Sequence, residues 1–218
     1  MAMKMNLPNK LTVLRLIMVP IFMAVMLVPI LADLSPLADT ILTLVGALLF
    51  IAASVTDMLD GKIARKYNLI TDFGKFLDPL ADKFMVIGAL VCIFLRSAFS
   101  GNKIMTTAYF FALVIIIFRE LAVTSIRLVA SSTGGVVIAA NILGKIKTVT
   151  QIVAISAALI EPVLWAVIGI FLGEGSIPAA LLAYPPITCL STLLMIYFTI
   201  HSGINYIAGA WKYLDPEK

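Results

Sequence analysis

Six long apolar runs follow one another along this chain, and they constrain its fold more than any other feature. A hydrocarbon core about 30 Å thick is crossed by about 20 helical residues at about 1.5 Å each. Each run is long enough to cross, and turn-forming residues separate the runs. We therefore predict an all-α integral membrane protein with six transmembrane helices in one domain, residues 1–218. The runs cover roughly residues 11–33, 38–66, 74–99, 104–131, 145–172 and 180–210.

The composition excludes several other classes of protein. The chain is 61% hydrophobic and 13% charged, whereas soluble domains are about 45–50% apolar and about 25% charged. This composition excludes a soluble enzyme and a disordered tail. The net charge of +4 does not come from a solvated basic face, so we also exclude a nucleic-acid binder. The first run imitates a signal peptide, but Arg15 heads it and no clean small-residue cleavage site follows. We interpret it as a retained membrane helix.

The distribution of Lys and Arg predicts the orientation. With the N-terminus inside, fourteen of the sixteen cations fall on the inner side and only Arg96 and Lys103 on the outer side. We therefore expect both termini in the cytoplasm of a multi-pass protein of the cell membrane. The fifth run is ambiguous, because Glu161-Pro162 offers an early end to its helix.

Two pairs of aspartates meet at one inner loop. Asp57 and Asp60 close the second run, Asp78 and Asp82 open the third, and spacings of three and four put each pair on one helix face. Ionised carboxylates share a low-dielectric site only when cations neutralise them. Oxygen ligands alone favour Mg²⁺, Mn²⁺ or Ca²⁺ over zinc. The alternative is four interfacial aspartates paired with nearby lysines and arginines.

Small and basic residues lie between the two pairs. Gly61, Ala64 and Gly74 leave room for a ligand beside the helices. Arg65 adds the forked donors that bind phosphate. Together with the acids they form the pattern Asp57-x2-Asp60-Gly61-x2-Ala64-Arg65-x8-Gly74-x3-Asp78-x3-Asp82.

At every defined position this pattern resembles the signature of the CDP-alcohol phosphotransferase family. The resemblance implies a six-helix membrane fold, commonly a homodimer, with a site that faces the cytoplasm. It implies transfer of a phosphatidyl or similar group from a CDP-linked donor to an alcohol, with release of CMP. Two divalent cations, Mg²⁺ or Mn²⁺, would bridge the diphosphate.

The resemblance also implies roles for single residues. The acceptor hydroxyl would attack the β-phosphorus of CDP-diacylglycerol in line, with Asp82 as the candidate general base. The implied metal ligands are Asp57, Asp60 and Asp78, with Asp82 near the second metal. The implied CDP-binding residues are Asp60, Gly61, Ala64, Arg65 and Gly74.

Three further segments, at residues 6–15, 119–127 and 144–148, are similar to the bacterial members of this family that use sn-glycerol 3-phosphate to make phosphatidylglycerophosphate. Clustered cations suit the phosphate of such an acceptor, although the positive-inside rule alone also places cations here. The expected clamp on the acceptor phosphate is Arg119, Arg127, Lys145 and Lys147. Asn9, Thr12 and Arg15 are candidates for the border of the nucleotide site, and a helix start or a topology anchor accounts for them nearly as well.

Two alternatives remain at this point. Inositol phosphate as the acceptor satisfies the same charge argument and is disfavoured only by resemblance. A divalent-cation transporter would also carry intramembrane aspartates, but it predicts acids spread over several helices near the bilayer midplane, without an arginine such as Arg65 beside them.

Overall fold

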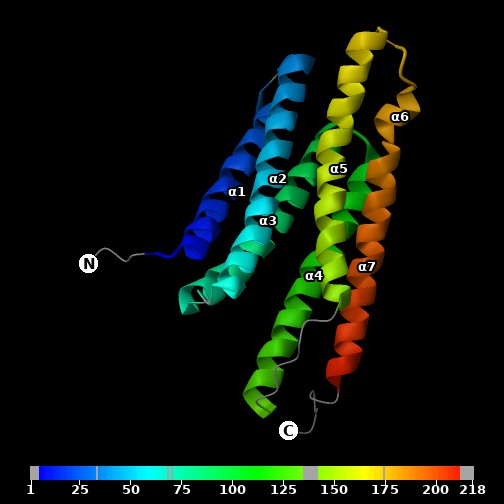
Figure 1. Cartoon of the computed structure of the whole chain (residues 1–218). Helices are drawn as coiled ribbons and strands as arrows, with labels where there is room; N and C mark the ends of the chain where they lie inside the picture. The colour runs from blue at the N-terminus through cyan, green and yellow to red at the C-terminus, as the bar shows by residue number, and fades with distance from the viewer. Residues whose placement is uncertain are drawn as a thin grey trace.

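The computed structural model describes residues 5–32, 34–67, 69, 71–134, 142–173 and 175–211. Every regular element in these residues is a helix: six helices have 25 to 32 residues and one has five. The helices are α1 (Leu7–Leu31), α2 (Pro36–Lys66), α3 (Asp72–Phe99), α4 (Lys103–Gly134), α5 (Ile142–Leu172), α6 (Ala179–Ala183) and α7 (Pro186–Ala210) (Figure 1).

Polar caps fix where the first three helices begin. The side chains of Asn6, Ser35 and Thr71 each accept a hydrogen bond from the backbone N–H three residues further on. Such caps satisfy donors that lack a partner in the first helical turn. Asn6 also donates to the backbone carbonyl of Leu69 at 2.9 Å. The start of α1 is thereby attached to the connection between α2 and α3.

The six long helices form a closed ring. α1 packs against α2 and α3, α2 also contacts α5, α5 packs against α7, and α4 packs against α3 and α7. The ring encloses an apolar core to which each long helix contributes. Its buried members include Phe22, Phe50, Leu90, Ile116, Leu159 and Met195.

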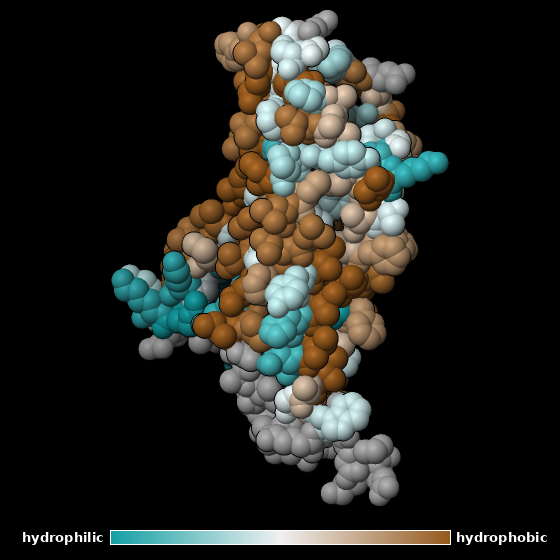
Figure 2. Space-filling model, turned by 90° about the vertical axis from the view of Figure 1, so that its right-hand side faces the viewer, coloured by the Kyte–Doolittle hydropathy of each residue, from teal (hydrophilic) through white to brown (hydrophobic). Residues whose placement is uncertain are grey.

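The outer surface is apolar as well. Large hydrophobic side chains are exposed along the helices, and they cover much of the face in Figure 2, with hydrophilic patches between them. In the described residues, five helical segments are long and apolar enough to cross a membrane: α1, α2, residues 103–129 of α4, α5, and α6 with α7. α3 has a comparable length but contains Asp78, Asp82, Lys83 and Arg96.

The ambiguous end of the fifth run is resolved by Glu161. α5 continues through Pro162 to Leu172, and the Glu161 side chain is almost fully buried. Its carboxylate accepts hydrogen bonds from the backbone N–H groups of Ile187 and Thr188, at 3.2 and 2.6 Å, and from the Thr188 hydroxyl at 2.8 Å. It therefore caps the first turn of α7 from a neighbouring helix.

Candidate active site

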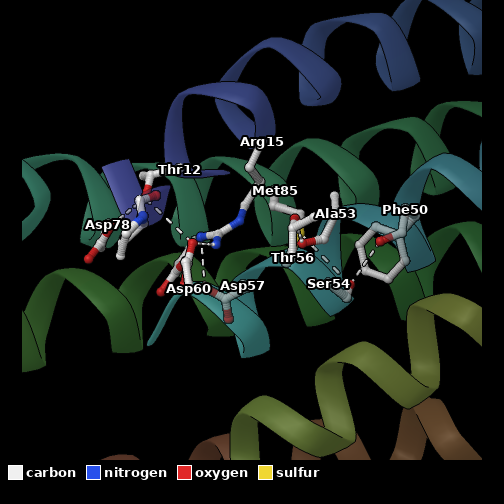
Figure 3. A network of polar contacts seen from close by, with 12 residues as sticks. Thr12, Arg15, Phe50, Ala53, Ser54, Thr56, Asp57, Asp60, Asp78 and Met85 are labelled. Atoms are coloured by element: carbon white, nitrogen blue, oxygen red, sulfur yellow. Dashed lines mark hydrogen bonds and ion pairs between the residues drawn. The ribbon is translucent and has the colours of Figure 1, made fainter. Parts of the chain in front are cut away.

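Arg15 lies among three of the aspartates that the sequence singled out. Its side chain is fully buried, on the face of α1 that packs against α2 and α3. Nη1 is 2.7 Å from Oδ1 of Asp57 and 2.6 Å from Oδ1 of Asp82, and Nη2 contacts Oδ2 of Asp60. Figure 3 shows the guanidinium reaching from α1 toward Asp57 and Asp60.

Thr12 brings the fourth aspartate to the same place. It lies one helical turn before Arg15, and its hydroxyl donates to Oδ1 of Asp78 at 2.7 Å (Figure 3). The hydroxyl oxygen of Thr12 is also 3.4 Å from Oδ2 of Asp60. We refer to the four aspartates, joined by Arg15 and Thr12, as the carboxylate cluster.

Gly74 lies where the first turn of α3 meets Asn9 of α1. The Thr71 hydroxyl donates to Oδ1 of Asn9 at 3.0 Å and also caps Gly74. A Cβ atom at position 74 would lie 3.0 Å from Oδ1 of Asn9 and 3.3 Å from Oγ1 of Thr71, so a side chain would displace these groups. The glycine therefore allows Asn9 of α1 and Thr71 to pack closely against α3 next to Asp78.

The other predicted CDP-binding residues lie at the end of α2. A Cβ atom at Gly61 would be 3.5 Å from Nη1 of Arg65, so the exposed Arg65 side chain lies back over the glycine. Ala64 is half-buried on the next turn. These residues follow Asp60 on α2.

The aspartates differ in their access to solvent. The side chain of Asp60 is 5% exposed, that of Asp57 is 28% exposed, and that of Asp82 is 49% exposed. Asp60 therefore forms the floor of the cluster and Asp82 its open edge.

A second charge cluster joins α4, α5 and α7. Oε1 of Glu120 contacts both Nη1 of Arg119, at 3.0 Å, and Nζ of Lys147. Arg119 also donates from Nη2 to the Ser202 hydroxyl at 2.9 Å. All three charged side chains are mostly buried. We refer to Arg119, Glu120 and Lys147 as the cation cluster.

Of the four predicted phosphate-binding cations, the structure brings Arg119 and Lys147 together. Arg127 lies two turns beyond Arg119 and donates from Nε to the Tyr206 hydroxyl at 2.7 Å, with its guanidinium 5.2 Å from the ring centre. Lys145 is exposed. Residues two apart on a helix point in nearly opposite directions, so Lys145 and Lys147 cannot both face the cluster.

Consecutive residues of α3 connect the two clusters. Asp82 contacts Arg15 on α1, whereas Nζ of Lys83 donates to the Thr124 hydroxyl of α4 at 2.6 Å. Thr124 lies one turn beyond Glu120 and donates to its backbone carbonyl at 2.7 Å. The carboxylate cluster and the cation cluster are thus neighbours across α3.

The carboxylate cluster fits a divalent cation by its chemistry. Among the residues that the structure describes, no three acids form a ready-made metal shell, and the Arg15 guanidinium stands between them. One guanidinium against four carboxylates leaves an excess of three negative charges, and every donor is a hard oxygen. These residues therefore suit a hard divalent cation such as Mg²⁺, Mn²⁺ or Ca²⁺.

Sequence reasoning did not find the central position of Arg15, the bridging role of Thr12, or the contacts of Ser202 and Tyr206. One signal was present for Arg15, because α1 contains an arginine inside an apolar helix that has no acidic residue. Its counter-ions had to come from other helices. Nothing in the sequence pointed to Ser202 or Tyr206, which lie in the last apolar run.

Comparison with known proteins identifies the family. The model of the CDP-alcohol phosphatidyltransferase family matches residues 5–211. A Bacillus subtilis CDP-diacylglycerol–glycerol-3-phosphate 3-phosphatidyltransferase is 42% identical over 212 residues, which cover 96% of this chain and 97% of the relative. The Escherichia coli K12 protein of the same name is 35% identical over 164 residues, 75% of this chain and 81% of the relative.

The chain therefore belongs to the CDP-alcohol phosphatidyltransferase family, and the resemblance inferred from the aspartate pattern is confirmed. A Rickettsia felis protein with the same name is 29% identical over 95% of this chain and 97% of its own length. Membership in a family of transferases disfavours the divalent-cation transporter.

Proposed function

We propose that this protein transfers the phosphatidyl group of CDP-diacylglycerol to sn-glycerol 3-phosphate, giving phosphatidylglycerophosphate and CMP. The names of its relatives support both substrates. One structural observation carries the proposal: two neighbouring clusters have opposite excess charge, so that one suits metal ions and the other suits a phosphate.

The carboxylate cluster would receive the donor. Asp57, Asp60, Asp78 and Asp82 would hold Mg²⁺ or Mn²⁺, two ions in all. When bound, such ions supply charge neutralisation for the diphosphate and for the oxygens at the reacting phosphorus. CDP would lie along Gly61, Ala64, Arg65 and Gly74, where the structure keeps small residues and one exposed guanidinium.

Asp82 would act as the general base. Its carboxylate is the most accessible of the three aspartates that contact Arg15, so an incoming hydroxyl can reach it without reorganising the floor of the cluster. The acceptor hydroxyl gives its proton to Asp82. The hydroxyl oxygen attacks the β-phosphorus of CDP-diacylglycerol. The bond from that phosphorus to CMP breaks, and CMP leaves with the bonding electrons.

The cation cluster would hold the phosphate of the acceptor. Arg119 and Lys147 are anchored by Glu120 and by Ser202, so their donors are positioned before the substrate arrives. Arg127 and Lys145 are further candidates for the same phosphate. Asn9 would border the nucleotide at the α1 side, next to Thr71 and Gly74.

We also propose six membrane crossings, with both termini in the cytoplasm and the site facing the cytoplasm at the cell membrane. The 28 residues of α3 correspond to about 42 Å of helix, more than a hydrocarbon core about 30 Å thick requires. Its charged first turns can therefore lie at the inner headgroup level. The family resemblance further suggests a homodimer.

The test is purified protein with labelled CDP-diacylglycerol, Mg²⁺ and a panel of acceptors. We expect phosphatidylglycerophosphate with glycerol 3-phosphate and little product with glycerol, serine or inositol phosphate. A preferred product from inositol phosphate would identify the other phosphorylated acceptor. Equal rates with glycerol and glycerol 3-phosphate would contradict a phosphate-binding role for the cation cluster.

A further inference from the structure

Arg15 is bonded more completely than a residue at the border of a nucleotide site would need to be. Its side chain is fully buried, and its two terminal nitrogens contact three carboxylates from two other helices. Nη1 alone bridges Asp57 of α2 and Asp82 of α3, at 2.7 and 2.6 Å. A cation that bridges carboxylates on α2 and α3 is what the proposed metal site also requires.

The guanidinium occupies one oxygen of each of three carboxylates that the proposed metal ions would also bind. Oδ1 of Asp57 and Oδ1 of Asp82 already face Nη1, and Oδ2 of Asp60 faces Nη2. A divalent cation approaches carboxylate oxygens to about 2.0–2.2 Å, closer than a hydrogen-bonding nitrogen does. Two cations that share these oxygens would also repel each other in a buried site.

Without metal, however, the cluster needs a cation. Four carboxylates brought together in a poorly solvated place repel one another, and a buried arginine deprived of its acids is equally costly. The contacts of Arg15 satisfy both needs. They also join α1 to α2 and α3, the helices that carry all four aspartates.

We propose that Arg15 is an internal counter-ion, which holds the carboxylate cluster together in the metal-free protein and withdraws from the aspartates when divalent cations bind. Metal and guanidinium then compete, and this competition weakens the apparent affinity for metal. This inference rests on the proposed role of the aspartates as metal ligands.

The experiment measures metal binding and stability without any substrate. Direct Mn²⁺ binding and thermal unfolding, with and without Mg²⁺, are measured for the wild type, Arg15→Gln and Arg15→Lys in detergent micelles. Loss of the charge-assisted hydrogen bonds of Arg15 should tighten Mn²⁺ binding in Arg15→Gln by about tenfold or more. The metal-free protein should unfold at a lower temperature, and the increase in Tm on adding Mg²⁺ should be larger than in the wild type.

Arg15→Lys keeps a buried cation but loses the fork that contacts several carboxylates. The Mn²⁺ affinity and the Tm of Arg15→Lys should lie between those of the wild type and Arg15→Gln. This variant also provides the comparison with the wild type if Arg15→Gln does not fold. Arg96→Gln is the matched control, because Arg96 forms another partly buried ion pair, with Asp39 at 2.7 Å. It should lower the Tm without changing Mn²⁺ affinity.

Unchanged or weaker Mn²⁺ binding in both Arg15 variants would overturn the counter-ion role, and weaker binding would mean that Arg15 assembles the site for the metal. Failure of the wild type itself to bind Mn²⁺ would instead remove the metal role of the aspartates. The two failures are therefore distinguishable.

Discussion

In the carboxylate cluster one guanidinium contacts three of the four acids and Thr12 bonds the fourth, whereas in the cation cluster one carboxylate contacts an arginine and a lysine. Both clusters are mostly buried, and both join three helices. In each cluster, a single side chain of opposite charge lies between the others and holds them in place. Arg15 does so for Asp57, Asp60 and Asp82, and Glu120 does so for Arg119 and Lys147.

The difference lies in the charge that remains unpaired. The carboxylate cluster retains negative charge that only cations can neutralise, and the cation cluster retains positive charge that suits an anion. Asp82 and Lys83, consecutive on α3, contact Arg15 of α1 and Thr124 of α4, so α3 links the helices that carry the two clusters. A site that must bring together two anionic substrates requires such an arrangement.

Removal of metal should have the largest effect, and it should act on only one of the two clusters. An excess of chelator should reduce turnover to background, because the aspartates alone repel a diphosphate, and Mg²⁺ or Mn²⁺ should restore it. The measurement is product formation during titration with chelator and metal. Turnover that persists in excess chelator would contradict a metal role for the carboxylate cluster.

Asp82→Asn should have the next largest effect. Loss of a general base lowers kcat by about 10²–10⁴-fold, while CDP-diacylglycerol should still bind through the remaining aspartates. Asp60→Asn is the contrasting variant, because it changes the buried floor of the cluster and should abolish metal-dependent nucleotide binding. Rates and nucleotide affinity separate the two, and near-normal turnover of Asp82→Asn at saturating metal would refute its role as the base.

Lys147→Gln should raise the KM for glycerol 3-phosphate far more than the KM for the donor. Loss of one charge-assisted contact to a dianion costs about 1.5–3 kcal/mol, a factor of roughly ten to a hundred. Lys145→Gln is the comparison variant, and it should have a smaller effect because Lys145 lies two residues away on the exposed face of α5. If both variants raise the acceptor KM equally, the overall positive potential of this surface contributes more to acceptor binding than the cation cluster does.

Tyr206→Phe should have the smallest effect. It removes the hydroxyl that accepts from Arg127 but keeps the ring beneath the guanidinium. This hydrogen bond acts on the acceptor only through the position of Arg127, and a typical hydrogen bond contributes about 0.5–1.5 kcal/mol, so the acceptor KM should rise by about two- to tenfold. An effect as large as that of Lys147→Gln would bring Arg127 into the cation cluster as an equal member.

Local patterns in the sequence were sufficient for the helices and for the aspartates. The long apolar runs correspond to the long helices, and spacings of three and four residues placed each aspartate pair on one face. Both features depend on residues close together in the chain. The same logic separates Lys145 from Lys147, because their spacing of two already puts them on opposite faces of a helix.

Long-range partners could not be read in this way. Arg15 is 45 residues from Asp60 and 67 from Asp82. Arg119 is 83 residues from Ser202. Glu161, next to a proline, marked an early helix end in the sequence, yet its partners on α7 make it a cap for another helix. Such pairings depend on how the helices pack, and one sequence contains no direct record of that.

The distance in sequence between Arg15 and Asp82 also bears on the biosynthesis of the protein. A ribosome adds about 5–20 residues per second, and 67 residues separate Arg15 from Asp82, so Arg15 is made roughly 3–13 s before Asp82. Until α2 is made the Arg15 side chain lacks all of its carboxylates, and until α3 is made it lacks Asp82, so it must extend toward water or lipid headgroups, as long cationic side chains do. We therefore expect that the first helix to be synthesised reaches its final position only after α2 and α3 have been inserted.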